Sequence, residues 1–585
     1  MRKSISKFLA VAMATMCVLS VAGCSQPVVG SDDEDSSGKS YLPVFVYNGG
    51  FGVEWAYKLE KAFELKYADT EFEPGKKGVN VKINPQKSAN VNLSGLLNTS
   101  SDEIYFVEKC NIPELVREQL IMDISDIVTD KLTAFEETRS IYDKMDEDAK
   151  GWFTNGGKIY GIPHYESYNG ITYNVDIWGD PVKGYSLYFA KGGCPSEYTR
   201  PAASSFENPE AHDDPLTGSF SSYEYTDLNG EKSAGPDGKY GTLDDGLPAT
   251  YEEFYHICEY MNESVTPIIW ANNFQTYATR GIVGALAADY EGERIKANWD
   301  FEGDIEIGVV DGDSVSSQIV TIDNSTGYQV YNQMGKYHAL TFMEQLIDND
   351  WTADACFSGK VTNQTAQNYF LYSGVVPGAE KIAMISEGVY WMEEASATSE
   401  TLADDYGVDS SNRKFAFMPL PKVSAEYIGT EKTLVDGLAS ACVVSKKVDS
   451  AKMDLIKTFI QFSHTDVELN NFTKYTDTAK GLDYQISSDV YDELSYYGKS
   501  IIDYRKSANV YHAYSDNPII KNYFFSFFYG ETENFYYSNV GGDKANPSSA
   551  MKDNKISALD YFKGFTKYTK YTQNYWNDSY SEYFN

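Results

Sequence analysis

The sequence predicts an α/β protein of more than one folding unit, and three observations carry this prediction. Residues 42–47 form a short apolar, β-favouring run that stops at the turn-forming residues 48–52. A helical pattern follows, with Trp55, Leu59 and Phe63 on one face, and residues 78–83 then alternate apolar and polar as a half-buried strand does. Strand, helix and strand in this order begin a lobe with a mainly parallel sheet. With 585 residues, 42% of them hydrophobic, the chain is long enough for two large lobes or about three to four smaller units.

The pattern continues along the chain with a third strand at 103–107 and a helix at 113–121. Residues 161–165 and 170–174 are extended, rich in aromatic residues and punctuated by Gly and Pro. Periodicity fades between 176 and 250, which indicates an insertion, and helical patterns resume at 251–261, 337–346 and 452–463. The C-terminal region is strongly aromatic, and no internal repeat is visible.

The first residues predict export. Arg2, Lys3 and Lys7 precede an apolar stretch of 14 residues, Phe8 to Val21, which is shorter than the roughly 20 residues of a membrane helix. This signal ends in Val-Ala-Gly-Cys24, which resembles a bacterial lipobox, so Cys24 is the predicted lipidation site; the alternative is an ordinary signal peptide with a coincidental Cys. Residues 1–23 are then the signal peptide and 24–40 an acidic, Ser-rich tether. We expect the protein outside the cytoplasm, held by lipid on the outer face of a Gram-positive membrane; Ser25 is also compatible with a Gram-negative periplasm, which is the alternative.

Charge and cysteine content exclude several classes of function. The chain has 85 acidic and 49 basic residues and a net charge of −36, which argues against a nucleic-acid partner. Five cysteines remain beyond Cys24; they lie far apart and form no CxxC pair, so they are expected to be small buried hydrophobic residues.

The insertion carries the only metal signal in the sequence. Asp227, Asn229 and Glu231 are followed by Asp237, Asp244 and Asp245 among glycines, and calcium prefers oxygen ligands brought together by tight turns. The bidentate Glu of an EF-hand loop is missing, because Gly238 occupies its position. The sequence predicts a structural calcium ion here, and an acidic surface loop is the alternative.

Four segments in order form a larger pattern. They are the opening strand with Asn48-Gly49-Gly50, residues 158–165 through Tyr173-Asn174, residues 380–388 with Tyr390-Trp391, and residues 415–421 followed by 436–439 and a helix from Ser450. In this order they resemble the extracellular solute-binding proteins of carbohydrate ABC transporters, the group that includes maltose-binding protein. Departures from the family are Glu380 in place of a Gly, the insertion, the long C-terminal region, and Tyr390 at the family's Trp position with Trp391 one residue later.

The resemblance implies a two-lobe periplasmic-binding-protein-like fold of type II, with hinge strands and an interdomain cleft that closes over a sugar. Lobe 1 is expected at 41–170 and 424–470, and lobe 2 at 171–423 and 471–585. The implied function is capture of an oligosaccharide, as a monomer, for delivery to ABC transporter permeases; no cofactor other than the structural calcium is expected.

The cleft of such a protein holds sugars by aromatic stacking and by hydrogen bonds to carboxylates and amides. Trp391 is the first choice for the stacking ring because its face is larger, with Tyr390 beside it. The further ligand candidates come from the lobe crossing, from strand ends and from loops: Tyr165, Glu166, Tyr168, Gly50, Glu54, Asp102, Glu103, Trp270, Asn272, Asn273 and Asp436.

Two other functions share these features. A secreted glycoside hydrolase needs two positioned carboxylates, but with 85 acids some pair is always close, and no G-x-S-x-G, H-E-x-x-H or G-x-G-x-x-G motif occurs. A surface lipoprotein that adheres to polysaccharide without a transporter is the other alternative. The sequence favours a binding protein over an enzyme.

Overall fold

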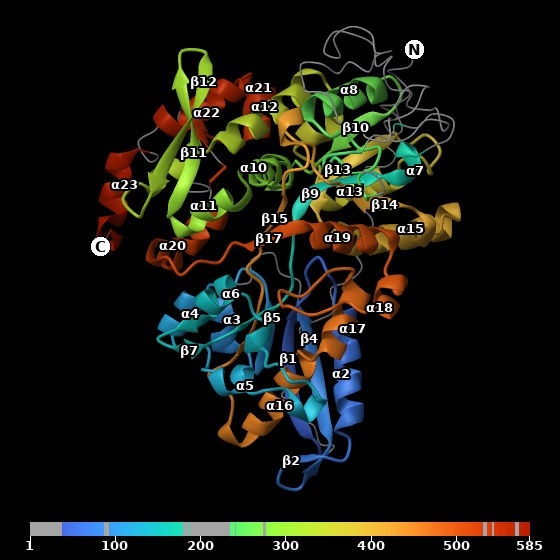
Figure 1. Cartoon of the computed structure of the whole chain (residues 1–585). Coiled ribbons are helices and arrows are strands. Elements are labelled where there is room, and N and C mark those ends of the chain that lie inside the picture. Colours follow the sequence, from blue (N-terminus) through green and yellow to red (C-terminus); the bar gives the residue numbers. More distant parts are fainter. Residues whose placement is uncertain are drawn as a thin grey trace.

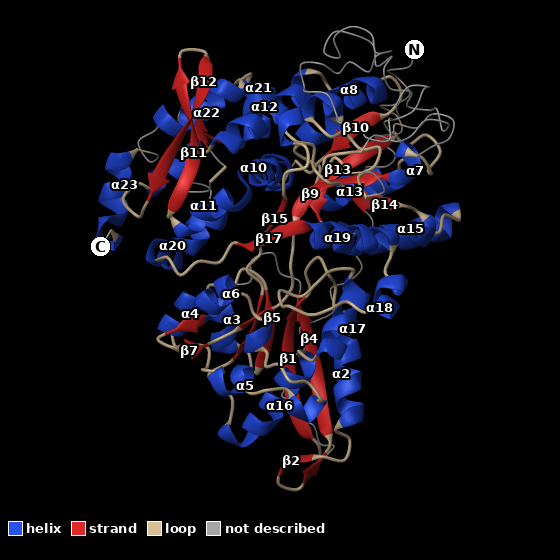
Figure 2. Cartoon of the chain, viewed as in Figure 1, coloured by secondary structure: helices blue, strands red, loops and turns tan. Residues whose placement is uncertain are grey.

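The computed structural model describes residues 38–86, 93–179, 185, 234–239, 242–272, 276–529, 535–536, 538–540, 543–567 and 572–584. Two lobes are stacked end to end, with the first half of lobe 1 in blue and cyan and lobe 2 mainly in green to red (Figure 1). Each lobe has a sheet covered by helices (Figure 2), so the predicted α/β, two-lobe class is confirmed.

Lobe 1 is built on a five-stranded sheet in the order β4-β1-β5-β16-β8. The central strand β1 (Ser40–Tyr47) pairs in parallel with β4 (Val79–Gln86) and with β5 (Ile104–Val107). β1 is buried along nearly its whole length, as its continuous apolar run predicts, whereas β4 alternates buried and exposed residues. β16 (Ala441–Val444) returns from late in the sequence to pair antiparallel with β5 and with β8 (Ile162–Pro163).

Helices cover this sheet with the faces that the sequence indicates. α2 (Glu54–Lys66) buries Trp55, Leu59 and Phe63, and the Phe63 ring packs 5.0 Å from Phe459 of α16 (Met453–Ser463). Further helices of lobe 1 are α3 (Leu93–Thr99), α4 (Ile112–Arg117), α5 (Ser125–Thr129), α6 (Glu147–Phe153) and α17 (Asp466–Thr476).

Lobe 2 has a four-stranded sheet in the order β10-β13-β9-β14. β10 (Thr266–Ile269) is parallel to the fully buried β13 (Ile382–Gly388), while β9 (Asn169–Asn174) is antiparallel to β13 and to β14 (Phe415–Phe417). Around it lie α7 (Val175–Trp178), α8 (Tyr251–Asn262), the π-helical segment Thr279–Gly284 continuing into α10 (Ala285–Glu291), α11 (Ala297–Asp300), α12 (Met334–Asp348), α13 (Asn363–Tyr372), α14 (Trp391–Glu394), α15 (Ser396–Tyr406) and α19 (Tyr496–Ser507).

Two hinge strands lie between the lobes. β15 (Lys432–Asp436) pairs in parallel with β17 (Ala508–His512), and the segment 164–168 makes the third crossing (Figure 1). The lobe boundaries at 424 and 470 stay a prediction. Residues before β15 still contact lobe 2, since the Tyr427 hydroxyl lies 3.3 Å from that of Tyr290, and α17 packs on lobe 1 through Phe472, whose ring is 5.2 Å from Trp55.

The C-terminal extension covers lobe 2 and also reaches lobe 1. α21 (Pro547–Asn554) and α22 (Ala558–Lys567) pack on α12, beside the long hairpin of β11 (Gly303–Asp311) and β12 (Ser314–Ile322). α20 (Pro518–Tyr529) lies at the boundary of the lobes, where Phe524 contacts Trp152 of α6 at 5.0 Å. The sequence predicted an aromatic C-terminal region, and the structure uses it to join the two lobes.

Two negative findings concern the described residues alone. Within them, no helix has both the length and the apolar character needed to cross a bilayer. The four described cysteines, Cys110, Cys258, Cys356 and Cys442, are buried and unpaired, as predicted, and Cys24 and Cys194 lie outside the described residues.

Candidate functional site

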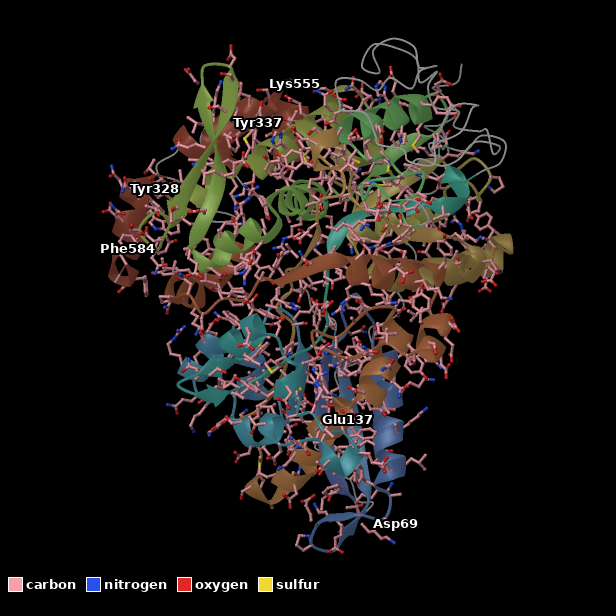
Figure 3. The ribbon with its side chains drawn as sticks, viewed as in Figure 1. Asp69, Glu137, Tyr328, Tyr337, Lys555 and Phe584 are labelled. Atoms are coloured by element: carbon pink, nitrogen blue, oxygen red, sulfur yellow. The ribbon has the colours of Figure 1, made fainter. Side chains whose placement is uncertain are left out.

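The two lobes touch where the loop after β1 meets the start of α14. The Phe51 ring lies edge-on to Tyr390 at 5.6 Å, and a Cβ added to Gly50 would collide with the Tyr390 ring. At Gly52, which has a positive φ of 63°, such a Cβ would lie 2.6 Å from a carboxylate oxygen of Glu393. Glycine at these two positions therefore permits the close approach of lobe 1 to lobe 2. Side chains occupy the boundary between the two lobes (Figure 3).

Lobe 1 presents a carboxyl group to this region. Glu108 follows directly after β5, at the carboxyl end of the strand, and accepts a hydrogen bond from the hydroxyl of Tyr165 at the lobe crossing. Burial raises the pKa of Glu108 to about 7, with Glu394 of lobe 2 adding to the rise and the Tyr165 hydrogen bond opposing it. Near neutral pH this carboxyl group exchanges between a form that donates a hydrogen bond and one that only accepts.

Lobe 2 presents two further carboxyl groups. Glu387 lies near the end of β13 and is 1% exposed; the Gln367 side-chain amide donates to it at 3.3 Å and to Glu394 at 2.8 Å. Burial, and then the neighbouring Glu394, raise the pKa of Glu387 well above its usual value. Tyr390 is close to the carboxyl groups of both lobes. Burial, then Glu387 and Glu394 of lobe 2, and then Glu108 of lobe 1 raise the pKa of its hydroxyl. We call these five residues, Glu108, Tyr165, Glu387, Tyr390 and Glu394, the cleft cluster.

The cleft cluster has the chemistry of a site for a neutral, hydroxyl-rich molecule. A neutral phenol both donates and accepts, a protonated carboxyl group does the same, and an ionised carboxylate only accepts; sugar hydroxyls can meet each of these groups because they donate and accept. Burial makes such hydrogen bonds stronger than in water. It also makes a charged ligand unfavourable unless an opposite charge pairs with it.

The two aromatic candidates of the third motif have different surroundings. Trp391 is fully buried in lobe 2, with ring centroids of Phe370, Phe415 and Tyr497 at 5.2–5.8 Å. Its ring therefore packs in the core, which is the alternative to stacking on a ligand, and Tyr390 takes the position that faces lobe 1. The tighter register of the family motif pointed to Tyr390, and ring size alone pointed to Trp391.

Four candidates at the lobe crossing have their polar groups engaged by other residues. Glu166 is 1% exposed and holds Arg505 of α19 through two hydrogen bonds of 2.5 and 2.6 Å, and Tyr168 donates to the same carboxylate. Asp436 contacts His512 at 3.0 Å and accepts from the backbone N–H of Ser167 at 3.1 Å. Glu166, Tyr168 and Asp436 thus stabilise the hinge, whereas Tyr165 belongs to the cleft cluster.

The hinge charges are fully paired. His512 lies between the carboxylates of Asp436 and Asp146, each at 3.0 Å. Burial by itself lowers the pKa of His512, but the hydrogen bonds to the two carboxylates outweigh it and raise that pKa well above 6.5. The Arg505 guanidinium likewise holds the pKa of Glu166 below its usual value despite burial. Ion pairs with both partners present are the form in which charge is tolerated inside a protein.

The remaining ligand candidates lie away from the cleft cluster. Asp102 and Glu103 precede β5, at the opposite end of the strand from Glu108; Asp102 accepts from Asn84, and Glu103 pairs with Lys452 at 2.8 Å. In open α/β sheets ligands bind at the carboxyl ends of the strands, where Glu108 lies and these two residues do not.

Of three more candidates, one lies on the surface of lobe 1 and two lie in lobe 2. Glu54 is exposed on α2, 3.3 Å from Lys58. Trp270 is 1% exposed and packs on Phe357, and Asn272 donates to the backbone carbonyl of Cys356 at 3.0 Å. Asn273 lies outside the described residues.

Half of the predicted calcium set is described. Asp227, Asn229 and Glu231 lie outside the described residues. Asp237 and Asp244 face the ammonium of Lys432 on β15, at 3.5 and 3.6 Å, and the Thr242 hydroxyl donates to Asp244 at 2.7 Å. No group of three or more metal-ligating side chains is present among the residues that the structure describes. Asp237 and Asp244 here tie the loop to the hinge, and Asp245 follows Asp244 in this loop.

Sequence reasoning missed Glu108, Glu387 and Glu394 as site residues. The available signal was position: Glu108 ends β5 and Glu387 nearly ends β13, on the carboxyl side of parallel strands. With 85 acids in the chain, composition alone gave no reason to choose these three.

Comparisons with known proteins agree with this architecture. No protein-family profile and no curated protein sequence matches the chain. Among solved structures, a chitin oligosaccharide binding protein is similar at a TM-score of 0.52 with 13% identity, over 93% of this chain and 99% of that one. The GacH receptor of Streptomyces glaucescens follows at 0.49 and 11%, over 93% and 99%, and a family 1 extracellular solute-binding protein of Bifidobacterium longum subsp. infantis at 0.43 and 13%, over 90% and 98%. The chain has the fold of the two-lobe extracellular solute-binding proteins, which confirms at the level of fold the resemblance seen in the four sequence segments.

Proposed function

We propose that this chain captures a neutral oligosaccharide between its two lobes and serves as the substrate-binding lipoprotein of an ABC importer. The observation that carries the proposal is the cleft cluster: carboxyl and phenol groups from both lobes converge where Gly50 meets Tyr390. The proteins of similar fold named above include one that binds chitin oligosaccharide, which supports a sugar as cargo.

The geometry suggests how a sugar is held. The Tyr390 ring offers a face for the C–H side of a pyranose, while Glu108 of lobe 1 and Glu387 and Glu394 of lobe 2 bind hydroxyls. A ligand that contacts both lobes favours the conformation in which they are close, and hinge rotation at β15 and β17 separates them. A permease pair in the membrane then recognises the closed form.

The envelope side of the proposal comes from the sequence. The signal of residues 1–23 and Cys24 predict a lipid anchor, and 24–40 serve as tether on the outer face of a Gram-positive membrane. Mass spectrometry of the protein expressed in such a host tests this: a diacylglyceryl mass on Cys24 is expected, and its loss in Cys24→Ala. A mature N-terminus elsewhere would contradict it.

Thermal unfolding of residues 25–585 against malto-, chito- and cello-oligosaccharides and raffinose tests the cargo. A ligand that binds only the native protein raises the free energy of unfolding by about 2.7 kcal/mol at a hundredfold excess over Kd. The unfolding midpoint therefore rises. X-ray scattering on the same samples should show a smaller radius of gyration with the binding sugar if the free protein opens. No shift with any sugar would overturn the proposal.

Two alternatives give different results in the same samples. A glycoside hydrolase, which a raised pKa at Glu108 would also suit, converts the sugar, so product chromatography after hours of incubation separates it from a binding protein. A polysaccharide adhesin binds insoluble polymer better than short oligosaccharides, which pull-down on chitin or starch measures.

A further inference from the structure

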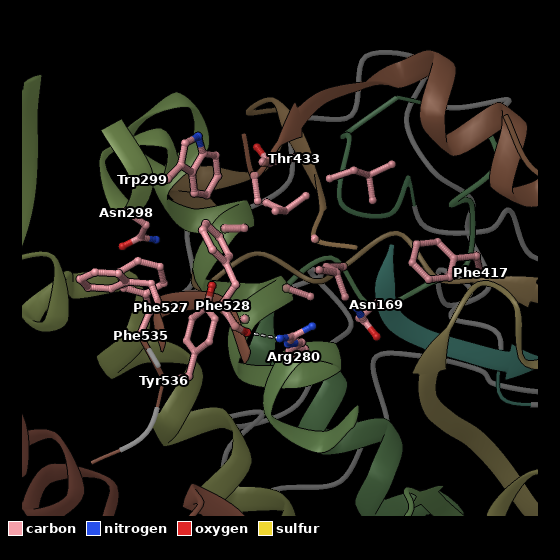
Figure 4. Close-up of a pocket in the computed structure, with 18 of the residues that line it drawn as sticks. Asn169, Arg280, Asn298, Trp299, Phe417, Thr433, Phe527, Phe528, Phe535 and Tyr536 are labelled. Atoms are coloured by element: carbon pink, nitrogen blue, oxygen red, sulfur yellow. Dashed lines mark hydrogen bonds between the residues drawn. The ribbon is translucent and has the colours of Figure 1, made fainter. Parts of the chain in front are cut away.

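A pocket lies inside lobe 2, next to the hinge and separate from the cleft cluster (Figure 4). Its walls come from the π-helical segment Thr279–Gly284 and α10, from α11, from β15, and from the C-terminal extension. The volume is about 80 Å³, which at roughly 10–15 Å³ for each water is room for several water molecules. Asn298 and Trp299 lie at one end in the close-up and Phe417 at the other, with Arg280 and Phe528 between them.

Four lining side chains carry buried polar atoms without a hydrogen-bond partner. Both the amide nitrogen and the amide oxygen of Asn298 are unpaired, and so are the indole nitrogen of Trp299 and the hydroxyls of Thr433 and Tyr504. These residues are 0–2% exposed. Buried polar groups in native proteins are nearly always satisfied, so five unpaired atoms around one pocket indicate that something polar completes them.

The rest of the lining indicates what kind of molecule does so. Aromatic rings of Trp299, Phe527, Phe528 and Phe535 surround the pocket, and among the described lining residues Arg280 is the only one with a permanent charge. That guanidinium already donates to the backbone carbonyl of Phe528 and lies 5.1 Å from the Tyr529 ring centroid. Unpaired amide, indole and hydroxyl groups between aromatic faces suit a neutral ring that carries hydroxyls.

The pocket lies next to the cleft cluster. Tyr529, against which Arg280 packs, donates from its hydroxyl to the carbonyl of Gly437 at 2.8 Å and lies 5.0 Å from the Lys109 ammonium. Lys109 directly follows Glu108 of the cleft cluster. One aromatic side chain, Tyr529, therefore stands between the pocket and the region where the lobes meet.

We infer that this pocket is a subsite for the hydroxyl-bearing edge of one neutral sugar ring at the end of the oligosaccharide, formed by the C-terminal extension and hydrogen-bonded by Asn298, Trp299 and Thr433. This rests on the proposed function and deepens it: the pocket sets the preferred chain length, while the cleft cluster holds the rest of the sugar. The extension supplies Phe527, Phe528 and Phe535, so the subsite depends on the part of the chain that the family resemblance does not cover.

The test is affinity as a function of chain length. Calorimetric titration with malto-, chito- and cello-oligosaccharides, from disaccharide to hexasaccharide, is made on the wild type, Asn298→Leu and Thr433→Val. In the series that binds, the Kd of the wild type should fall by about tenfold or more when one particular sugar unit is added. We call this fall in Kd the step. Both variants should lose most of that step and keep the affinity for the shorter sugar.

Asn332→Leu is the matched control, because Asn332 is also buried with an unpaired amide oxygen but does not line the pocket. It should retain the step. Thr433→Val keeps the side-chain shape, so it reports on the pocket even where Asn298→Leu fails to fold.

The indole N–H signal of Trp299, assigned with Trp299→Phe, gives a direct readout by nitrogen–proton NMR. It should move on saturation with the longer sugar and stay unchanged with the shorter one. A step that survives in both variants, or an unmoved Trp299 signal, would overturn the subsite while leaving the proposed function intact. If no sugar binds the wild type, the proposed function fails first and the subsite with it.

Discussion

The hinge and the cleft cluster both hold carboxyl groups in buried or partly buried positions, yet the partners of these groups differ. At the hinge, Glu166 has Arg505 and Asp436 has His512 at 2.5–3.0 Å; burial raises the pKa of Asp436, and His512 opposes that rise. In the cleft cluster the hydrogen-bonding side chains are neutral, Tyr165 at Glu108 and Gln367 at Glu387, and burial raises the pKa values of both acids. Ion pairs stabilise the hinge, whereas carboxyl groups with raised pKa values are suited to exchange hydrogen bonds with a neutral ligand.

The largest effect is expected at the hinge. Arg505→Met leaves Glu166 buried without its counter-charge, which should lower the free energy of unfolding by about 3–5 kcal/mol. Urea denaturation followed by fluorescence measures it. Lys58→Met, which removes the exposed partner of Glu54, is the control and should change stability by less than about 0.5 kcal/mol. Equal effects of the two variants would contradict the distinction drawn for the hinge.

The next effect concerns the cleft cluster and ligand affinity. Tyr390→Ala removes the ring that faces lobe 1 and should weaken sugar binding by about 1–3 kcal/mol. Trp391→Phe alters the neighbouring core ring and should leave affinity within about threefold while lowering the melting midpoint. If Trp391→Phe weakens binding more than Tyr390→Ala does, the assignment of the two rings is reversed.

A smaller effect should appear as a dependence on pH. Because the pKa of Glu108 rises from 4.5 to about 7 on folding, the native protein binds the extra proton between these values, and stability from this group falls as pH rises through that window. Glu108→Gln should flatten the slope and stabilise the protein by about 1–2 kcal/mol at pH 8 relative to pH 4.5. Urea midpoints of both proteins across this range provide the measurement, and parallel curves would show that Glu108 titrates normally.

The smallest expected effect is that of calcium on the insertion loop. Calcium remains a proposal for Asp227, Asn229, Glu231, Asp237, Asp244 and Asp245, and extracellular sites bind it with Kd of about 0.1–1 mM. Millimolar calcium should then stabilise the protein by about 0.5–1.5 kcal/mol, reversed by a chelator and not reproduced by magnesium. An unchanged melting midpoint would assign the described carboxylates to Lys432 alone.

The regular elements were predictable from local patterns. The apolar run at 42–47 became β1, the amphipathic pattern after Glu54 became α2, and the helices predicted at 251–261 and 452–463 formed as α8 and α16. Periodicity reports which face of an element is buried, and this survives in the tertiary structure.

The site was less predictable. Trp391 and Tyr390 are adjacent in sequence, and only packing decided that the larger ring enters the core between Phe370 and Phe415. Similarly, Glu166 is a buried acid and Glu108 a partly buried one, and the ion pair with Arg505, 339 residues away in the sequence, makes Glu166 part of the hinge. A local pattern carries no information about such distant partners.

The sequence by itself predicts an export signal, and it determined the α/β elements, the acidic charge and the order of motifs that implies two lobes. Each of these depends on residue type and near spacing, which the chain states directly. Only the tertiary structure decided which acids are paired, which ring faces lobe 1, where lobe 1 resumes after β15, and that the aromatic C-terminal extension lines a pocket beside the hinge. Those outcomes depend on contacts between residues tens to hundreds of positions apart, because burial and pairing are properties of the folded surroundings of a side chain.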